Sequence, residues 1–236
     1  MRYCLVLTAL VLFYACKNQT KTSKDDKIQV PDTVTTKSIE PKNIPVNNDT
    51  LRANDTITRK NAVEFLIAYG EQHPETLVKL KTRLGDMTLK LYKDTPLHRA
   101  SFLFLSNEGY FNTTCFHRVV PDFLIQGGNS ESLKTLEIKN KYQNYNIPPE
   151  FRNHRTHKYG AVAAAREWEN NISKKSDAFE FYIIQNKNGA HHIDGEHTVF
   201  GQVIDGFEVL NKIAHVKTGR DEWPLEDVYM EIEVLK

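Results

Sequence analysis

The sequence has little cysteine and no excess of charge of either sign. Its three cysteines are Cys4, Cys16 and Cys115. Because two of them lie in the opening segment, the rest of the chain has neither a disulfide framework nor a zinc site of paired cysteines. Lys and Arg number 31 and Asp and Glu 30, a formal net charge of +1. This balance provides no broad basic surface, so we expect no nucleic-acid partner.

The sequence also lacks an apolar run long enough to cross a bilayer as a helix. Its mostly apolar stretch at residues 4–15 follows the positive Arg2 and is about a dozen residues long, whereas a spanning helix needs about 20. Residues 1–15 are therefore interpreted as a signal peptide. The Ala15-Cys16 pair resembles the lipobox of bacterial lipoproteins, which predicts a lipid on Cys16 after cleavage. Plain secretion and an uncleaved anchor are the alternatives.

Aromatic residues are absent from residues 16–57, where Lys, Asn, Thr, Asp and Ser dominate. Such a composition cannot bury enough apolar surface to offset the loss of chain entropy on folding. We therefore expect a disordered tether that holds the following domain clear of a membrane. Together, the tether and a lipid on Cys16 predict a lipid-anchored protein of the cell envelope, periplasmic or associated with the outer membrane.

The pattern changes at residue 58. Ala62, Phe65, Leu66 and Tyr69 recur at helical spacing and predict a short helix within residues 58–75.

Most of the remaining chain shows short apolar or alternating segments typical of strands. These segments are residues 78–82, 87–91, 116–120, 123–126, 161–165, 181–185, 198–203 and 228–234. Helices are predicted from Thr95-Pro96 onward and over residues 206–214. Because strands and helices do not alternate regularly, the pattern disfavours a parallel doubly wound sheet. It favours an antiparallel barrel plugged by helices.

One segment carries a specific family resemblance. Residues 116–128 read Phe-His-Arg-Val-Val-Pro-Asp-Phe-Leu-Ile-Gln-Gly-Gly. This resembles the cyclophilin signature of Phe-His-Arg, two aliphatic residues, Pro, any residue, Phe, an aliphatic residue or Met, any residue and Gln-Gly-Gly. Further matches follow in the family's order at residues 160–166, 181–183 and 193–201. The resemblance implies a peptidyl-prolyl cis-trans isomerase domain over residues 76–236. The implied fold is mainly β, a closed eight-stranded antiparallel barrel capped by two α-helices.

The resemblance also implies the residues of the site. Arg118 is the catalytic donor, and Gln126 holds Arg118 or the substrate by hydrogen bonds. The implied substrate-binding residues are Phe123, Leu124, Ala165, Arg166, Glu180, Tyr182, Ile193 and His197. No metal or other cofactor is implied. From strand geometry alone, a bend at Pro121 is needed to bring these side chains together.

Among the departures from the family's pattern, those at Glu180, Tyr182 and His192 have a direct consequence for binding. Glu180 stands where many members have an amide, and it either pairs with Arg118 in competition with substrate or points away. Tyr182 adds a hydroxyl to the proline pocket, and that hydroxyl must find a partner. His192 replaces a tryptophan that helps bind cyclosporin, so we expect weak inhibition by that drug.

The sequence therefore predicts a monomeric enzyme that accelerates cis/trans isomerisation of Xaa-Pro bonds in unfolded exported proteins. A chaperone module that binds proline-containing peptides without turnover is the first alternative. An envelope lipoprotein with a purely structural role is the second.

Overall fold

A computed structural model of the chain describes residues 56–236. The predicted signal peptide, Cys16 and nearly all of the predicted tether lie outside the described residues. In this described part, no helix combines the length and the apolar character needed to span a bilayer.

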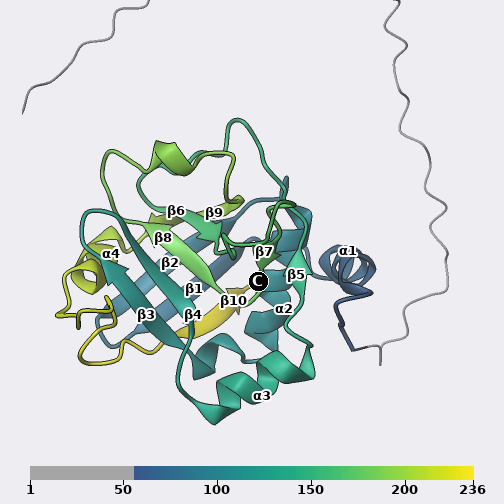
Figure 1. Ribbon diagram of the computed structural model, residues 1–236, viewed down its shortest axis with the longest axis horizontal. Helices are drawn as coiled ribbons and strands as arrows, with labels where there is room; N and C mark the ends of the chain where they lie inside the picture. The colour runs from purple at the N-terminus through teal and green to yellow at the C-terminus, as the bar shows by residue number, and fades with distance from the viewer. Residues whose placement is uncertain (1–55) are drawn as a thin grey trace, which may run out of the picture. The chain divides into compact units, whose positions relative to one another are not determined.

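Eight antiparallel strands form a single curled sheet, as predicted (Figure 1). From edge to edge the order is β10, β1, β2, β9, β6, β8, β4 and β3. Their bounds are β1 Leu77–Thr82, β2 Gly85–Leu91, β3 Cys115–Val120, β4 Leu124–Asn129, β6 Ala161–Ala164, β8 Phe181–Ile184, β9 Val199–Asp205 and β10 Glu231–Leu235. A separate pair joins β5, Asn146–Ile147, to β7, Ser176–Asp177.

The alternation of residue types sets the register of the first hairpin. Leu80 lies opposite Met87 and Val78 opposite Leu89, and all four side chains are buried. Residues directly opposite each other point to the same face of a sheet. The apolar side chains of β1 and β2 therefore lie together on the core face.

The sheet is open along one line, so the prediction of a closed barrel is corrected. Its edge strands β3 and β10 are joined only indirectly, through the segment that precedes β10. In that segment Tyr229 forms an isolated bridge with Cys115, and the Val228 carbonyl accepts a hydrogen bond of 3.0 Å from the Phe116 amide. β3 and β10 do not pair as strands, because the residues that face β3 are Val228 and Tyr229, whereas β10 begins only at Glu231.

Four α-helices accompany the sheet in the described range: α1 Ala62–Gln72, α2 Pro96–Asn107, α3 Leu133–Lys141 and α4 Phe207–Ala214. α2 and α4 lie at opposite ends of the curled sheet, as predicted for the two capping helices (Figure 1). α1 lies inside the range predicted for the N-terminal helix. α3 was not predicted from the sequence.

α2 is buried on all sides from His98 to Ser106, because it lies between the sheet and α1. On one side, the ring of Phe102 packs edge-on against Phe181 of β8 at 5.3 Å. On the other, Phe104 packs edge-on against Phe65 of α1 at 5.1 Å. Helix α1 is thus part of the hydrophobic core.

The C-terminal end of α1 is satisfied by a buried arginine of α2. The last carbonyls of a helix have no partner inside the helix. The guanidinium of Arg99 donates to the carbonyl oxygens of Gly70 at 2.9 Å, His73 at 2.5 Å and Glu75 at 3.2 Å. Arg99 therefore ties α1 to the domain.

The glycine pair at residues 127 and 128 is required by the packing of β4. A Cβ on Gly127 would lie 2.6 Å from Met230 and 3.2 Å from Phe116. Gly128 has a φ of +98°, and a Cβ there would lie 2.1 Å from the carbonyl oxygen of Phe179. Only glycine fits these two positions without displacing the core.

Candidate active site

Four neighbouring strands bring one row of side chains together. Arg118 of β3 lies opposite Gln126 of β4, which lies opposite Tyr182 of β8, and Tyr182 lies opposite Ala163 of β6. Opposed residues share a face, so the four side chains line one transverse row on the side of the sheet away from the main core. The arginine, the amide and the aromatic ring are therefore neighbours.

The turn between β3 and β4 adds Phe123 to this row. Asp122 takes a left-handed φ of 58°, which reverses the chain just after Pro121, as the predicted bend requires. Gln185 holds the turn: its side-chain oxygen accepts from the Asp122 backbone N–H at 2.8 Å, and its backbone N–H donates to the Phe123 carbonyl at 2.8 Å. Gln185 is 4% exposed, so this anchor is shielded from water.

An apolar cluster separate from the main core lies around Tyr182. Its buried members are Tyr92, Leu124, Ala161, Ala163, Ala165, Tyr182, Ile184, Ala190 and Val199. Phe123 and Ile193 pack against it half-buried, and the exposed His192 stacks on Phe123 with ring centroids 5.8 Å apart. The cluster thus presents a partly open apolar surface beside Arg118 and Gln126.

The hydroxyl of Tyr182 has a buried partner, as the sequence requires. Tyr182 Oη lies 3.0 Å from Nε2 of His157, and Nδ1 of His157 lies 2.7 Å from Oδ1 of Asp194. A carboxylate only accepts hydrogen bonds, so Nδ1 carries the proton and Nε2 accepts from the tyrosine. Burial lowers the pKa of His157 against the opposing effect of Asp194, which keeps the ring neutral in this role.

His197 forms one wall of the cluster. Its ring meets Tyr182 edge-on at 5.5 Å, and its Nδ1 lies 3.2 Å from the Ala164 carbonyl oxygen. Burial lowers the pKa of His197 to about 4. At neutral pH this wall is uncharged and suits an apolar ligand.

Arg118 is engaged by a carboxylate that sequence reasoning missed. Its Nε donates to Oε2 of Glu222 at 2.6 Å, and the Glu222 carbonyl accepts from the Val119 amide at 2.9 Å. Both side chains are partly exposed, at 37% and 43%. The contact uses Nε, so the two terminal nitrogens of the guanidinium are the donors available to a ligand.

Glu180 points away from Arg118, which settles the two possibilities raised by the sequence. Its carboxylate accepts from Gln126 Nε2 at 3.1 Å and Lys139 Nζ at 3.3 Å, and lies 3.5 Å from His117 Nε2. Burial opposes its ionisation, but His117 and Lys139 outweigh burial and lower the pKa of Glu180. The contact commits one N–H of Gln126 and fixes the orientation of its amide.

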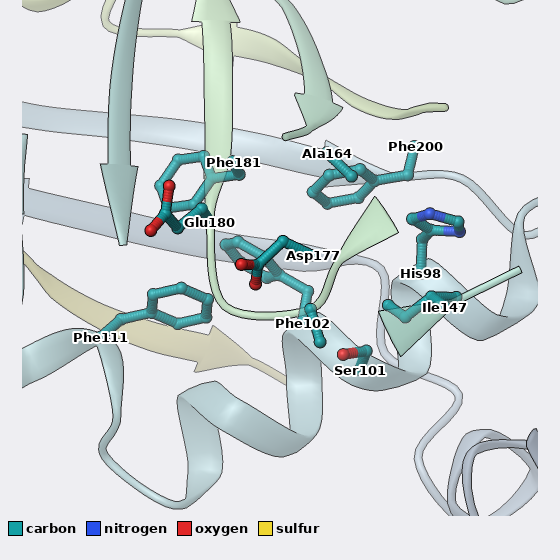
Figure 2. A pocket seen from close by; sticks show the side chains of 11 residues that line it. His98, Ser101, Phe102, Phe111, Ile147, Ala164, Asp177, Glu180, Phe181 and Phe200 are labelled. Atoms are coloured by element: carbon teal, nitrogen blue, oxygen red, sulfur yellow. The ribbon is translucent and has the colours of Figure 1, made fainter. Parts of the chain in front are cut away.

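A small cavity lies on the core side of this carboxylate (Figure 2). Asp177, Glu180, Ala164, Ser101 and His98 line it together with apolar side chains. Burial and the charge of Glu180 raise the pKa of Asp177 to about 6. The cavity therefore holds a carboxyl group that titrates close to neutrality.

A family model described as cyclophilin type peptidyl-prolyl cis-trans isomerase/CLD matches residues 77–234 of this chain. The chain belongs to the cyclophilin family. The match takes in the whole sheet of this cyclophilin except the last residue of β10, and it leaves out α1.

Several relatives of this cyclophilin carry the isomerase activity in their names. A Streptococcus pyogenes protein named for phosphatase and peptidyl-prolyl cis-trans isomerase activities is 34% identical over 193 residues, 70% of this chain but 40% of that protein. This cyclophilin therefore spans less than half of that relative's length. A peptidyl-prolyl cis-trans isomerase of Acinetobacter baylyi is 35% identical over 61% of this chain and 74% of its own. A Staphylococcus aureus protein named for peptidyl-prolyl cis-trans isomerase activity is 30% identical over 68% of this chain and 91% of its own length.

Solved structures share the fold. A Cryptosporidium parvum cyclophilin type peptidyl-prolyl cis-trans isomerase, crystallised in the presence of the dipeptide Ala-Pro, is 22% identical, with a TM-score of 0.56 over 68% of this chain and 99% of that one. A second crystal structure of the same Cryptosporidium parvum protein gives a TM-score of 0.57.

The cyclophilin fold gathers most of the predicted site residues. Arg118, Gln126, Phe123 and Tyr182 lie in or beside the transverse row, and Leu124, Ala165, Ile193 and His197 belong to or border the apolar cluster. The side chain of Arg166 is only 4% exposed and is held by Glu196, so it braces a loop. Phe181 precedes Tyr182 in β8, so its side chain points to the opposite face of the sheet and belongs to the main core, and Cys115 is a buried free thiol.

Glu222, His157 and Gln185 are the residues of this cyclophilin site that the sequence did not reveal. Each contacts a site residue far away in the chain: the residue numbers of Arg118 and Glu222 differ by 104, and those of Asp122 and Gln185 by 63. The one usable signal is the tyrosine hydroxyl at residue 182, which demands a buried polar partner.

Proposed function

We propose that this protein is a peptidyl-prolyl cis-trans isomerase that acts on Xaa-Pro bonds of unfolded exported proteins. The observation that carries the proposal is the transverse row, in which a guanidinium and an amide adjoin an apolar surface around Tyr182. The isomerase names of the bacterial relatives and the Ala-Pro dipeptide of the Cryptosporidium structure support the same substrate class.

The reaction needs a donor but no nucleophile. Rotation about a peptide C–N bond has a barrier of about 18–20 kcal/mol because resonance stiffens that bond. In the twisted transition state the prolyl nitrogen regains its lone pair and becomes an acceptor. A terminal N–H of Arg118 directed at that nitrogen binds the twisted form better than the planar form, which lowers the barrier.

The required stabilisation is modest. Uncatalysed Xaa-Pro exchange takes tens to hundreds of seconds. A turnover of about 10 per second needs roughly 10³-fold acceleration, or about 4 kcal/mol. A charged hydrogen bond of about 1.5–3 kcal/mol supplies a large share of this. An apolar surface that fixes the proline ring beside the donor supplies the remainder through orientation.

The test is turnover of an Xaa-Pro peptide by the purified protein and two variants. Arg118→Ala is expected to lower kcat/KM by about 10²-fold, the typical effect of removing one transition-state donor. Arg118→Lys keeps the charge but loses the planar set of donors, so an intermediate rate is expected. Circular dichroism checks that each variant is folded. Full activity of folded Arg118→Ala would overturn the mechanism.

A peptide-binding module without turnover is the second candidate, and the Arg118–Glu222 contact favours it. If the carboxylate keeps the guanidinium from the prolyl nitrogen, the protein binds proline-containing peptides but does not accelerate their isomerisation. Peptide binding by the unaltered protein, measured by calorimetry, together with a rate equal to the uncatalysed one identifies this case.

The setting of the proposed activity is the cell envelope, with the domain anchored through a lipid on Cys16. This rests on the apolar residues 4–15, the Ala15-Cys16 pair and the polar composition of residues 16–57. Incorporation of a labelled fatty acid into the full chain, and its loss in Cys16→Ala, is the expected result. Unlabelled full chain would contradict the anchor.

A further inference from the structure

The loop between β6 and β7 carries an exposed aromatic side chain close to the site. Trp168 is 61% exposed, although a tryptophan ring usually contributes most when it is buried. Its ring meets that of His197 edge-on at 5.2 Å. Because His197 also contacts Tyr182 at 5.5 Å, the three rings form a continuous series from the centre of the apolar cluster to the surface.

Trp168 is held in place from one side. The guanidinium carbon of Arg166 lies 4.1 Å from the centroid of its ring. Arg166 is itself fixed, since Nε donates to the Glu196 carbonyl at 2.8 Å and a terminal nitrogen donates to the Glu196 carboxylate at 2.8 Å. A buried, fully engaged cation thus supports one face of the indole.

The rest of the loop is braced as well. Asn171 Nδ2 donates to the carbonyls of Glu167 at 3.1 Å and Lys175 at 2.8 Å, which staples the loop across its base. Lys174 Nζ lies 2.7 Å from the Glu196 carboxylate. Because these contacts hold the loop that carries Trp168, we expect binding there to cost little conformational entropy.

We propose that Trp168 binds an apolar side chain of the substrate polypeptide, preferably aromatic, that lies within about three residues of the proline. This inference rests on the proposed function. The ring-to-ring steps of 5.5 Å from Tyr182 to His197 and 5.2 Å from His197 to Trp168 put Trp168 no farther from Tyr182 than about three residues of extended chain at about 3.3 Å each. The partner is a stretch of unfolded protein in which an aromatic residue accompanies proline.

The experiment compares peptides that differ at one position. A series with a single Phe at each of the three positions before and after the proline, and alanine elsewhere, is assayed by exchange NMR. Exchange NMR needs no coupled protease, so the residues on either side of the proline can be varied freely. Aromatic pairs contribute enough to raise kcat/KM about twofold to tenfold over the all-alanine peptide at the favoured position.

Variants locate the preference. Trp168→Ala is expected to bring the Phe-to-Ala ratio of kcat/KM to about one, whereas Trp168→Phe keeps most of it. Ile172→Ala is the matched control, since Ile172 is an apolar side chain of the same loop and is 98% exposed; its ratio should equal that of the unaltered protein. A ratio near one at every position, or a ratio that survives Trp168→Ala, overturns the inference.

Failure of the proposed function gives a different result. If the unaltered protein turns over none of the peptides, the isomerase proposal fails, and the same peptides are compared by dissociation constant. Tighter binding of one Phe peptide that is lost in Trp168→Ala still supports the inference. Equal constants for Phe and alanine peptides overturn it.

Discussion

Glu222 contacts Arg118 through its side chain and the neighbouring Val119 through its main chain. Its carboxylate accepts from Arg118 Nε at 2.6 Å, while its carbonyl accepts from the amide of Val119, the next residue of β3. Glu222 holds this position with a left-handed φ of 65°. The contact therefore depends on the conformation of the loop as well as on charge.

Glu222→Gln should raise kcat/KM, because it removes the negative charge that competes for Arg118 while leaving a side chain of similar shape. Exposed ion pairs contribute about 0.2–1 kcal/mol, so the expected increase is at most about fivefold. Initial rates at low salt measure it, and added salt should narrow the difference. Glu226→Gln, in the same loop but paired with Arg83, is the control. A lower rate would mean that Glu222 orients Arg118 rather than competing for it.

Tyr182→Phe should destabilise the protein by about 1–3 kcal/mol, because it leaves the buried Nε2 of His157 without its partner. Urea unfolding at neutral pH measures the change. Tyr159→Phe is a useful comparison, since its hydroxyl accepts from Asn211 at a half-buried position that water can reach. If the two variants lose equal stability, burial of the Tyr182–His157 hydrogen bond does not increase its contribution to the free energy of unfolding.

Asp177→Asn should stabilise the protein at neutral pH. The pKa of Asp177 is raised to about 6, so the ionised carboxyl disfavours the folded state above that pH. This cost grows between pH 3.8, the ordinary value, and about 6. We therefore expect a gain of about 3 kcal/mol at pH 7 and none below about pH 4.

Denaturant unfolding at several pH values tests this, with the exposed Asp205→Asn as the control. A gain from Asp177→Asn that is the same at pH 4 and pH 7 would point to packing instead of charge.

His197→Phe should reduce the slope with which the free energy of unfolding falls as the pH is lowered. The pKa of His197 is lowered to about 4 in the folded protein, whereas the unfolded side chain takes up its proton near 6.5. Between these values the unfolded state binds more protons, so stability falls as pH falls, by up to about 1.4 kcal/mol per pH unit for one group. Unfolding between pH 4.5 and 6.5 should show a shallower slope in the variant. An unchanged slope would exclude His197 as the source.

The strands were predictable because their apolar residues recur at period two, as Val78, Leu80, Met87 and Leu89 do. Helix α3 was not, since its only buried residue is Thr135 and it offers no apolar stripe. The word closed overstated the barrel, because closure depends on where β10 begins, which the alternation of residues before Glu231 does not reveal.

The site divides in the same way. Arg118 and Gln126 were identified from a contiguous signature, and sheet register then places them opposite each other. Glu222 and His157 reach the site from distant loops, and Glu222 does so through a backbone conformation that its residue type disfavours. No local pattern encodes such contacts.

The contacts of Arg99 show that the folded domain begins before Leu77, the residue at which the family match begins. A shortened protein that begins at Leu77 would lack the carbonyl groups of Gly70, His73 and Glu75, to which the buried guanidinium of Arg99 donates. It would also expose the ring of Phe104. Such a truncation should self-associate through the bared flank of α2. The residues of α1 thus keep an apolar flank of α2 covered, and they form part of the folded domain although the family match leaves them out.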